Sequence, residues 1–198
     1  MDTQISTKDK ILNAALNEFG SKGYALASTN TMAKTALLSK GVFFKYFHSK
    51  AELFLACYKR ELDRFLEAYN GFQVHLSDEL FEQIIDILIW KGQYAQDHPE
   101  ASEVLLEGLA NPPPEIKEQI LESMIKLKDV SMATLFSKIQ LHNLRDDLTP
   151  TDVQRVLNIA ISGLQATYIN KQVSFKVLES IRQESIDYIK IIIRGMEK

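Results

Sequence analysis

The side chains with the clearest chemical potential gather near the start of the chain, in residues 28–50. Lys34, Lys40, Lys45 and Lys50 follow one another there at intervals of five or six residues. Ammonium groups at this density suit ion pairing with the phosphates of a nucleic acid. Small polar residues such as Thr29 and Asn30 accompany them.

The charge of the chain is distributed unevenly. Residues 1–50 hold seven lysines against three acidic residues, a net charge of +4, although the whole chain carries −3. The remaining 148 residues therefore carry −7. This asymmetry indicates a cationic face for phosphate and an anionic body. Lysines scattered over a solvated surface are the alternative interpretation.

Two short helices joined by a tight turn are predicted to position these side chains. Ser28 can cap the first, because its oxygen can accept from a free backbone N–H of the first turn. Ser39 can cap the second, after a break at residues 37–38. Ser49 and Glu52 form a capping box that opens a third helix. Helix, turn and short helix is the layout of a DNA-binding helix-turn-helix.

Residues 10–53 resemble the N-terminal domain of the tetracycline-repressor (TetR) family of bacterial transcription regulators. The matching residues run in order and need no gap: Ile11, Leu12, Ala14, Ala15, Phe19, Gly23, Tyr24, Ser28, Ala33, Lys34, Ala36, Ser39, Lys40, Gly41, Tyr46, Phe47, Ser49, Lys50, Glu52 and Leu53. The resemblance covers about a quarter of the chain.

Two positions depart from the family pattern. Leu37 stands where the family usually has a turn glycine, and a positive φ there costs a residue with a Cβ about 1–2 kcal/mol. Either the turn differs or the packing of Leu37 offsets the strain. Phe44 stands where the family usually has a tyrosine whose hydroxyl donates to a DNA phosphate. Both departures predict weaker DNA binding.

The resemblance implies a set of DNA-contacting residues within the predicted helix-turn-helix. Base or groove contacts are expected from Asn30, Lys40, Gly41 and Val42, with Lys40 donating to guanine. Phosphate contacts are expected from Thr29, Lys45 and Lys50, with Tyr46 near the DNA backbone. The full predicted set is Ser28, Thr29, Asn30, Ser39, Lys40, Gly41, Val42, Phe44, Lys45, Tyr46 and Lys50.

Helical periodicity extends over the whole chain and predicts an all-α fold of about nine helices. We expect a helix-turn-helix domain in residues 1–50 and a linking helix over 49–70. Residues 51–198 would form a helical bundle for ligand binding and dimerisation. A helix ending between Gly20 and Gly23 is expected first, and a long one over residues 115–142 later.

The last two helices are the best candidates for a dimer surface, as the family resemblance also implies. Small residues would let a second copy approach closely, and apolar residues exceed what one core face needs. The predicted interface comprises Ala160, Gly163, Ala166, Thr167, Ile181, Tyr188 and Ile192. The alternative is that these helices complete the core of the monomer.

A pocket for a small apolar or amphipathic organic effector is expected in the middle helices. Its predicted lining comprises Trp90, Tyr94, Met124, Met132, Phe136 and Tyr168, which could equally be plain core. No enzyme motif, metal-ligand spacing, signal peptide or membrane span is evident. The single cysteine, Cys57, fits a cytoplasmic protein and is interpreted as a buried apolar residue rather than a redox sensor.

The sequence thus predicts a cytoplasmic, ligand-responsive repressor that binds a palindromic operator in double-stranded DNA as a homodimer. No cofactor is expected. The alternative is a helical ligand-binding or adaptor protein whose basic domain has lost DNA binding. The departures at Leu37 and Phe44 motivate that alternative, as does the lack of arginine before Arg60.

Overall fold

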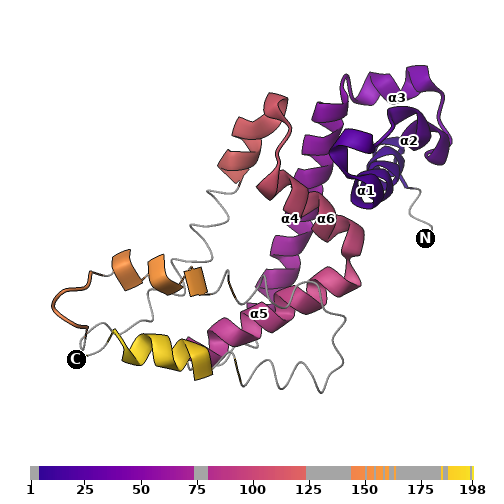
Figure 1. The fold of residues 1–198 in the computed structure, drawn as a ribbon. Helices are drawn as coiled ribbons and strands as arrows, with labels where there is room; N and C mark the ends of the chain where they lie inside the picture. Colours follow the sequence, from indigo (N-terminus) through magenta and orange to yellow (C-terminus); the bar gives the residue numbers. More distant parts are fainter. Residues whose placement is uncertain are drawn as a thin grey trace. The chain divides into compact units, whose positions relative to one another are not determined.

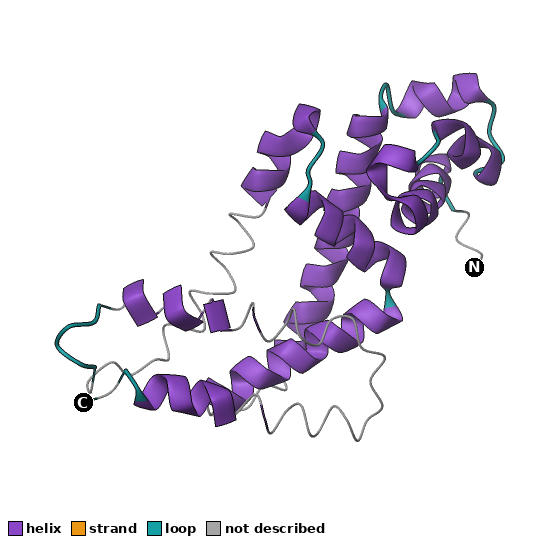
Figure 2. Ribbon diagram, in the orientation of Figure 1, coloured by secondary structure: helices purple, strands orange, loops and turns teal. Residues whose placement is uncertain are grey.

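The computed structural model describes residues 5–73, 80–123, 144–149, 151–153, 155–157, 159–160, 163, 184, 187–196 and 198. Helices are the regular elements throughout this described part (Figures 1 and 2), which confirms the predicted all-α class. They are α1 (Thr7–Leu26), α2 (Thr29–Thr35), α3 (Lys40–Tyr46), α4 (Lys50–Gln73), α5 (Leu80–Asp97), α6 (Pro99–Ala110) and the 3-10 helix η1 (Pro114–Ile116). Helical residues follow η1 as far as 123 and recur at 151–153 and 187–194.

A serine begins each of the first four helices. Its hydroxyl oxygen accepts from the backbone N–H three residues on, at 3.1 Å for Ser6, 3.4 Å for Ser28, 3.3 Å for Ser39 and 3.0 Å for Ser49. These bonds satisfy N–H groups that a helix start leaves without partners. In the box at α4 the Glu52 carboxylate accepts from the N–H of His48 at 2.7 Å, one residue before the Ser49 N–H that donates in a regular capping box.

The first helix runs further than its glycines predicted. We expected it to end between Gly20 and Gly23, but α1 continues to Leu26 with a break at Gly23. Gly23 has φ 71° and ψ 167°, a backbone conformation that side chains with a Cβ rarely adopt. Helical geometry resumes after it because Ala27 donates to the Gly23 carbonyl at 3.1 Å.

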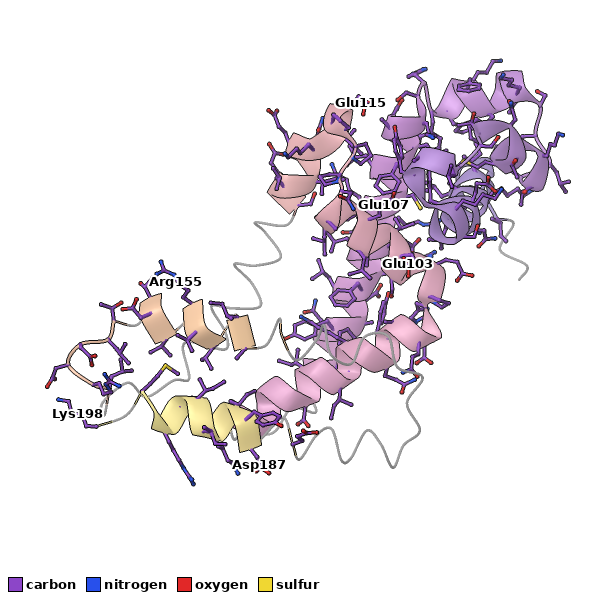
Figure 3. All side chains as sticks on the ribbon, viewed as in Figure 1. Glu103, Glu107, Glu115, Arg155, Asp187 and Lys198 are labelled. Atoms are coloured by element: carbon purple, nitrogen blue, oxygen red, sulfur yellow. The ribbon has the colours of Figure 1, made fainter. Side chains whose placement is uncertain are left out.

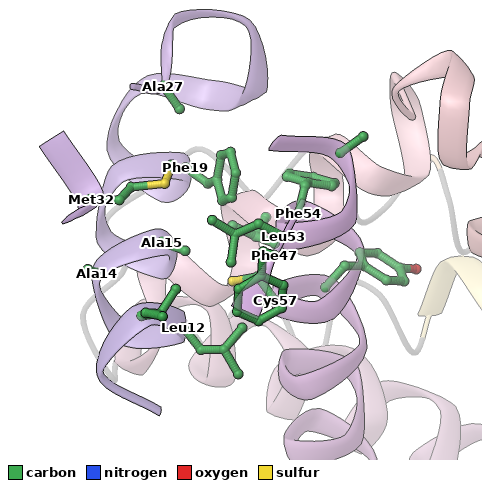
Figure 4. Close-up of a cluster of buried hydrophobic side chains, with 14 of the residues drawn as sticks. Leu12, Ala14, Ala15, Phe19, Ala27, Met32, Phe47, Leu53, Phe54 and Cys57 are labelled. Atoms are coloured by element: carbon green, nitrogen blue, oxygen red, sulfur yellow. The ribbon is translucent and has the colours of Figure 1, made fainter. Parts of the chain in front are cut away.

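One apolar core joins the N-terminal helices (Figure 4). Phe19 of α1 is 5.0 Å from Phe54 of α4, ring centre to ring centre, in an edge-to-face arrangement. Met32 of α2 and Phe43 of α3 are fully buried against the same core. Because these side chains are large and closely packed, they fix α2 and α3 on α1 and α4.

Cys57 lies inside this core, and its side chain is fully buried. Burial raises the pKa of the thiol to about 12 from its ordinary value of 9.0, with smaller effects from Arg60, Glu61 and Arg64. Since the thiolate is the reactive form, this cysteine is an apolar core residue and not a reactive thiol.

The chain packs as two compact units. One comprises residues 1–71 and 95–127, and the other comprises residues 72–94 and 128–198. Helix α6 therefore groups with the N-terminal helices, although it lies far from them in sequence. The predicted division into residues 1–50 and 51–198 is a division by function, and it stays a prediction.

Two glycines bring α6 close to its neighbours. A Cβ on Gly20 of α1 would stand 2.6 Å from the Glu100 Cα of α6, and one on Gly108 of α6 would stand 2.5 Å from the Tyr58 ring of α4. No side chain fits at either distance without movement. Glycine at both positions thus allows α6 to pack directly on α1 and α4.

Candidate nucleic-acid interface

Helices α2 and α3 each turn one face to the core and the other to solvent. Met32 and Ala33 of α2 are buried, as is Phe43 of α3. Asn30 of α2 and Val42 of α3 are exposed. The apolar spacing therefore leaves the predicted base-contacting residues on the outer faces of the two helices.

The turn between α2 and α3 keeps the backbone conformation that a glycine would favour. Leu37 has φ 57°, the one positive φ outside glycine in the described residues. Its N–H donates to the Lys34 carbonyl, and the N–H of Leu38 donates to the Ala33 carbonyl, each at 3.0 Å. The Leu37 side chain is 91% exposed, so packing does not offset the strain. Neither expected accommodation is present: the turn is retained and its strain is left in place.

The outward face of α3 carries exposed polar side chains on both sides of Gly41, which has no side chain. Ser39, Lys40, Lys45 and Tyr46 are exposed along it. A Cβ added to Gly41 would meet no atom within 4 Å. The fold itself therefore has room for a side chain at this position. Its absence leaves the backbone of α3 open to close approach from outside.

Phe44 is half-buried at the edge of the core. Its ring meets Phe43 edge-on, with 5.5 Å between ring centres. The ammonium of Lys40 stands 5.9 Å from the centre of the same ring, within the range of a cation–π contact. The Phe44 ring thus lies within cation–π range of the Lys40 ammonium on the outer face of α3.

Lys50, predicted to contact phosphate, has acceptors within the protein. Its ammonium donates to the carbonyls of Ala25 and Ala27, each at 3.2 Å, and lies 4.6 Å from the centre of the Tyr24 ring. An ammonium has three N–H donors, so two are used by these carbonyls. Lys50 joins the start of α4 to the end of α1.

A buried carboxylate that we did not select from its sequence context supports the start of α2. Glu18 is 7% exposed, and its carboxylate accepts from the Ser28 N–H at 3.1 Å and from Lys22 at 2.8 Å. Burial alone would raise the pKa of Glu18, but these hydrogen bonds and the charge of Lys22 outweigh it and leave the pKa lowered. Glu18 is ionised in the fold and holds Ser28, the predicted cap, next to Thr29.

The predicted effector residues are only partly within the described chain. Trp90 of α5 stacks on Phe72 with 5.3 Å between ring centres, and Tyr94 lies 5.5 Å from Trp90 at a tilt of 40°. These three form an aromatic row in the second compact unit. Met124, Met132, Phe136 and Tyr168 lie outside the described residues.

The predicted dimer residues divide in the same way. Tyr188 is 47% exposed and Gly163 has open space where a Cβ would stand, while Ala160 and Ile192 are half-buried. Ala166, Thr167 and Ile181 lie outside the described residues. Two isoleucines that we did not select, Ile159 and Ile191, are 68% and 64% exposed.

The described part of the chain lacks two other features. It contains no group of three or more His, Cys, Asp or Glu side chains placed to hold a metal ion. None of its helices is both long enough and apolar enough to span a membrane.

Comparison with known proteins agrees with this geometry. Residues 11–57 match the sequence model of the family "Bacterial regulatory proteins, tetR family". The HTH-type transcriptional regulator UidR of Escherichia coli K12 is 27% identical over 170 residues, 82% of this chain and 78% of UidR. The transposon Tn10 TetC protein of Escherichia coli is 32% identical over 90 residues, 42% of this chain and 45% of TetC. This chain thus matches less than half of the length of TetC.

The fold has solved counterparts over nearly its whole length. FadR of Bacillus subtilis, solved in complex with stearoyl-CoA, superposes with a TM-score of 0.68 and covers 90% of this chain and 95% of its own. Its sequence identity is 17%, so this likeness concerns the fold alone.

Fold and site together define a DNA-binding regulator of the helix-turn-helix class. The motif begins at a capped α2, ends in α3, and lies within the segment that the family model matches. The chain belongs to the TetR family of bacterial transcriptional regulators.

Proposed function

We propose that the protein is a ligand-responsive repressor that binds a palindromic operator as a homodimer. The observation that carries this proposal is the outer face of α3, with exposed Lys40 and Val42 flanking a glycine that the fold does not require. A recognition helix in the major groove needs such a face, because its N-terminal residues approach the base edges closely.

The proposed contacts are those that the family resemblance implies. Lys40 would donate to guanine, Val42 would touch a thymine methyl, and Asn30 of α2 would reach the groove beside them. Thr29 and Lys45 would bind phosphates. Lys50 would bind a phosphate with its third N–H donor, since the other two donate to the carbonyls of Ala25 and Ala27. Tyr46 and the caps Ser28 and Ser39 would lie near the DNA backbone, and Phe44 would support Lys40.

A dimer would present two such helices to the two halves of a palindrome. Its support is apolar exposure on the last helices: Ile159, Tyr188 and Ile191 are each 47–68% exposed. Gly163 adds an open position at which a second helix can approach closely. The predicted residues Ala160 and Ile192 border these positions in sequence, and Ala166, Thr167 and Ile181 complete the proposed interface.

Effector binding is proposed for the second compact unit. The aromatic row of Phe72, Trp90 and Tyr94 supports an apolar effector surface there. Lys91 follows Trp90 on α5, and burial lowers the pKa of its ammonium. An amphipathic effector would suit both features, and the complex of FadR with stearoyl-CoA is a precedent in a protein of the same fold. Binding would favour a conformation unfit for both half-sites.

The decisive experiment is a titration against the DNA that flanks the gene of this protein, at two salt concentrations, with random duplex as the control. We expect tight binding to the flanking DNA and a steep loss of affinity with salt, because each neutralised phosphate contributes about 0.9 to the logarithmic slope. Equal or absent binding to both duplexes would favour the adaptor alternative over the regulator.

Two substitutions on α3 separate base contact from general charge. Lys40→Ala should lose both affinity and sequence discrimination, and an unchanged operator preference would contradict the base contact. Gly41→Ala should not harm folding, because its Cβ meets no atom and alanine favours a helix. It should nevertheless weaken operator binding, since the added methyl group would stand between α3 and the DNA.

We further propose that the protein acts in the cytoplasm and has no enzymatic activity, as the regulator role implies.

A further inference from the structure

A single helical turn leads into the helix-turn-helix and is separated from the body of α1. The break at Gly23 (φ 71°, ψ 167°) turns the following N–H, that of Tyr24, out of the direction of the helix. The turn then closes with the bond from Ala27 to the Gly23 carbonyl. We call residues 24–27 the lead-in turn. Ser28, the cap of α2, follows it directly.

The N–H freed at Gly23 is bound by a side chain from α6. Both carboxylate oxygens of Glu107 accept from the Tyr24 N–H, at 2.8 and 2.7 Å. The two residues are 83 positions apart in sequence, and the bond is partly buried. Hydrogen bonds to a charged acceptor are among the stronger ones in proteins. Glu107, which is labelled in Figure 3, therefore holds the beginning of the lead-in turn through this bond.

The position of Glu107 is itself fixed by packing. Val104 lies about one helical turn before Glu107. Its side chain is buried in the core that α6 shares with α1 and α4. Gly108, the next residue, lies against the Tyr58 ring so closely that a Cβ would stand 2.5 Å from it. Because α6 packs this tightly, the carboxylate transmits the position of α6 to the lead-in turn.

The other end of the lead-in turn is held from α4. Lys50 donates to the carbonyls of Ala25 and Ala27, and its ammonium lies over the Tyr24 ring. An acidic group thus binds the N–H end of the turn and a basic group binds its carbonyl end. With both ends held, the place at which α2 begins is set by α6 and α4 together.

We propose that Glu107 is a positioning residue for DNA binding, acting through the lead-in turn on α2 and, through the turn at Leu37, on α3. The inference rests on the proposed DNA-binding function. It assigns to a residue of α6 a part in operator recognition, although that carboxylate carries the wrong charge to touch DNA.

The test compares Glu107→Ala with Glu103→Ala. Glu103 lies one turn earlier on the same helix (Figure 3), is exposed, and has no hydrogen bond or ion pair among the described residues. Both substitutions remove one negative charge and introduce the best helix former. Simple electrostatics would make either variant bind DNA more tightly. We expect this of Glu103→Ala, and a loss of about tenfold or more in operator affinity for Glu107→Ala.

Random duplex separates positioning from loss of structure. Since nonspecific binding depends on charge more than on the placement of α3, Glu107→Ala should bind random duplex at least as well as the wild type. An equal loss on both duplexes, or operator affinities that match those of Glu103→Ala, would overturn the proposal. Glu107→Gln keeps one carbonyl acceptor and should lie between the wild type and Glu107→Ala.

Hydrogen exchange supplies a measurement that needs no DNA. The amides of residues 24–27 should exchange faster in Glu107→Ala, and those of the Glu103→Ala protein should match the wild type. Unchanged exchange in Glu107→Ala would disprove the hold on the lead-in turn. A wild-type protein that does not bind operator DNA would instead count against the proposed function. The exchange measurement would still show whether Glu107 holds the lead-in turn.

Discussion

Leu37 carries strain that no other contact of its side chain offsets. Its φ of 57° costs about 1–2 kcal/mol for a residue with a Cβ, and the side chain is 91% exposed. Leu37→Gly should therefore stabilise the protein by about 0.5–1 kcal/mol, because the strain that it relieves exceeds the entropic cost of glycine, about 0.5–1 kcal/mol. Chemical denaturation measures the change.

Leu26→Gly is the matched control for that prediction. Leu26 is also exposed, at 78%, but it has ordinary helical geometry in α1. The same substitution should there destabilise by about 1 kcal/mol, because glycine is a poor helix former. Changes of the same sign at both leucines would show that strain at residue 37 is not the cause.

Phe44 offers a way to strengthen DNA binding by one atom. A tyrosine hydroxyl at this half-buried edge of α3 would reach toward solvent, where the family resemblance implies a phosphate contact. A hydrogen bond to a charged group contributes about 1.5–3 kcal/mol, so Phe44→Tyr should tighten operator binding about tenfold or more. In Phe43→Tyr the hydroxyl would be buried, since Phe43 is 1% exposed, and we expect lower stability without tighter binding. Titrations of both variants against the same operator decide this.

The thiol of Cys57 predicts a pH dependence of stability. Its pKa is about 12 in the fold and near 9.0 when unfolded, so between these values the unfolded chain alone gives up the proton. Stability from this group is complete below pH 9 and falls as pH rises, by about 1.4 kcal/mol at pH 10. Denaturation of wild type and Cys57→Ser from pH 8 to 10 should show the steeper loss in the wild type. Parallel pH profiles would contradict it.

At the scale of single residues, local chemistry was predictable and distant partners were not. The four serine caps and the positive φ at residue 37 depend on neighbours within a few positions, and the structure has them. Glu18 and Glu107 act on backbone groups 10 and 83 residues away. Nothing in their local sequence distinguishes these two from a solvated surface glutamate.

At the scale of elements, α6 belongs to the same compact unit as α1 and the helix-turn-helix. Gly20 shows how close the two helices lie, since a Cβ there would be 2.6 Å from the Glu100 Cα. Gly20→Ala should force α1 and α6 apart and destabilise by about 1–3 kcal/mol, as overpacking does. Thermal unfolding followed by helix content measures the effect.

Gly92→Ala provides the comparison within another helix. A Cβ on Gly92 of α5 meets no atom of the described residues within 4 Å, so alanine should stabilise by up to about 1 kcal/mol. Equal effects at residues 20 and 92 would mean that helix propensity, and not the α1–α6 approach, determines the response.

The helices themselves were predictable from apolar spacing and caps, whereas their grouping was not. Every start from α2 to α4 falls one residue after its predicted serine. The end of α1 was misplaced because Gly23 reads as a stop, yet the carboxylate of Glu107 supports a further turn beyond it. The placement of α6 with the N-terminal helices depends on contacts between distant parts of the chain, which periodicity does not encode.

At the scale of the molecule, the proposed dimer makes a prediction about the last helices. Ile159 and Ile191 are 68% and 64% exposed, and a charge at either should oppose association in an apolar interface. Ile159→Asp and Ile191→Asp should shift the protein from dimer to monomer at micromolar concentration, as measured by sedimentation. Leu121→Asp, on an exposed leucine outside these helices, is the control. A dimer retained in both isoleucine variants would place the interface elsewhere.

The bond between Tyr24 and Glu107 also sets an order in time. A ribosome that has just made the helix-turn-helix has not yet made its support, because 83 residues separate the two partners. At about 5–20 residues per second, the nascent chain waits about 4–17 s before Glu107 follows Tyr24. During that interval the lead-in turn lacks its carboxylate, and Lys50, which lies 26 residues after Tyr24, is made well before Glu107. The lead-in turn and the helix-turn-helix after it are thus synthesised before the carboxylate that completes their contacts.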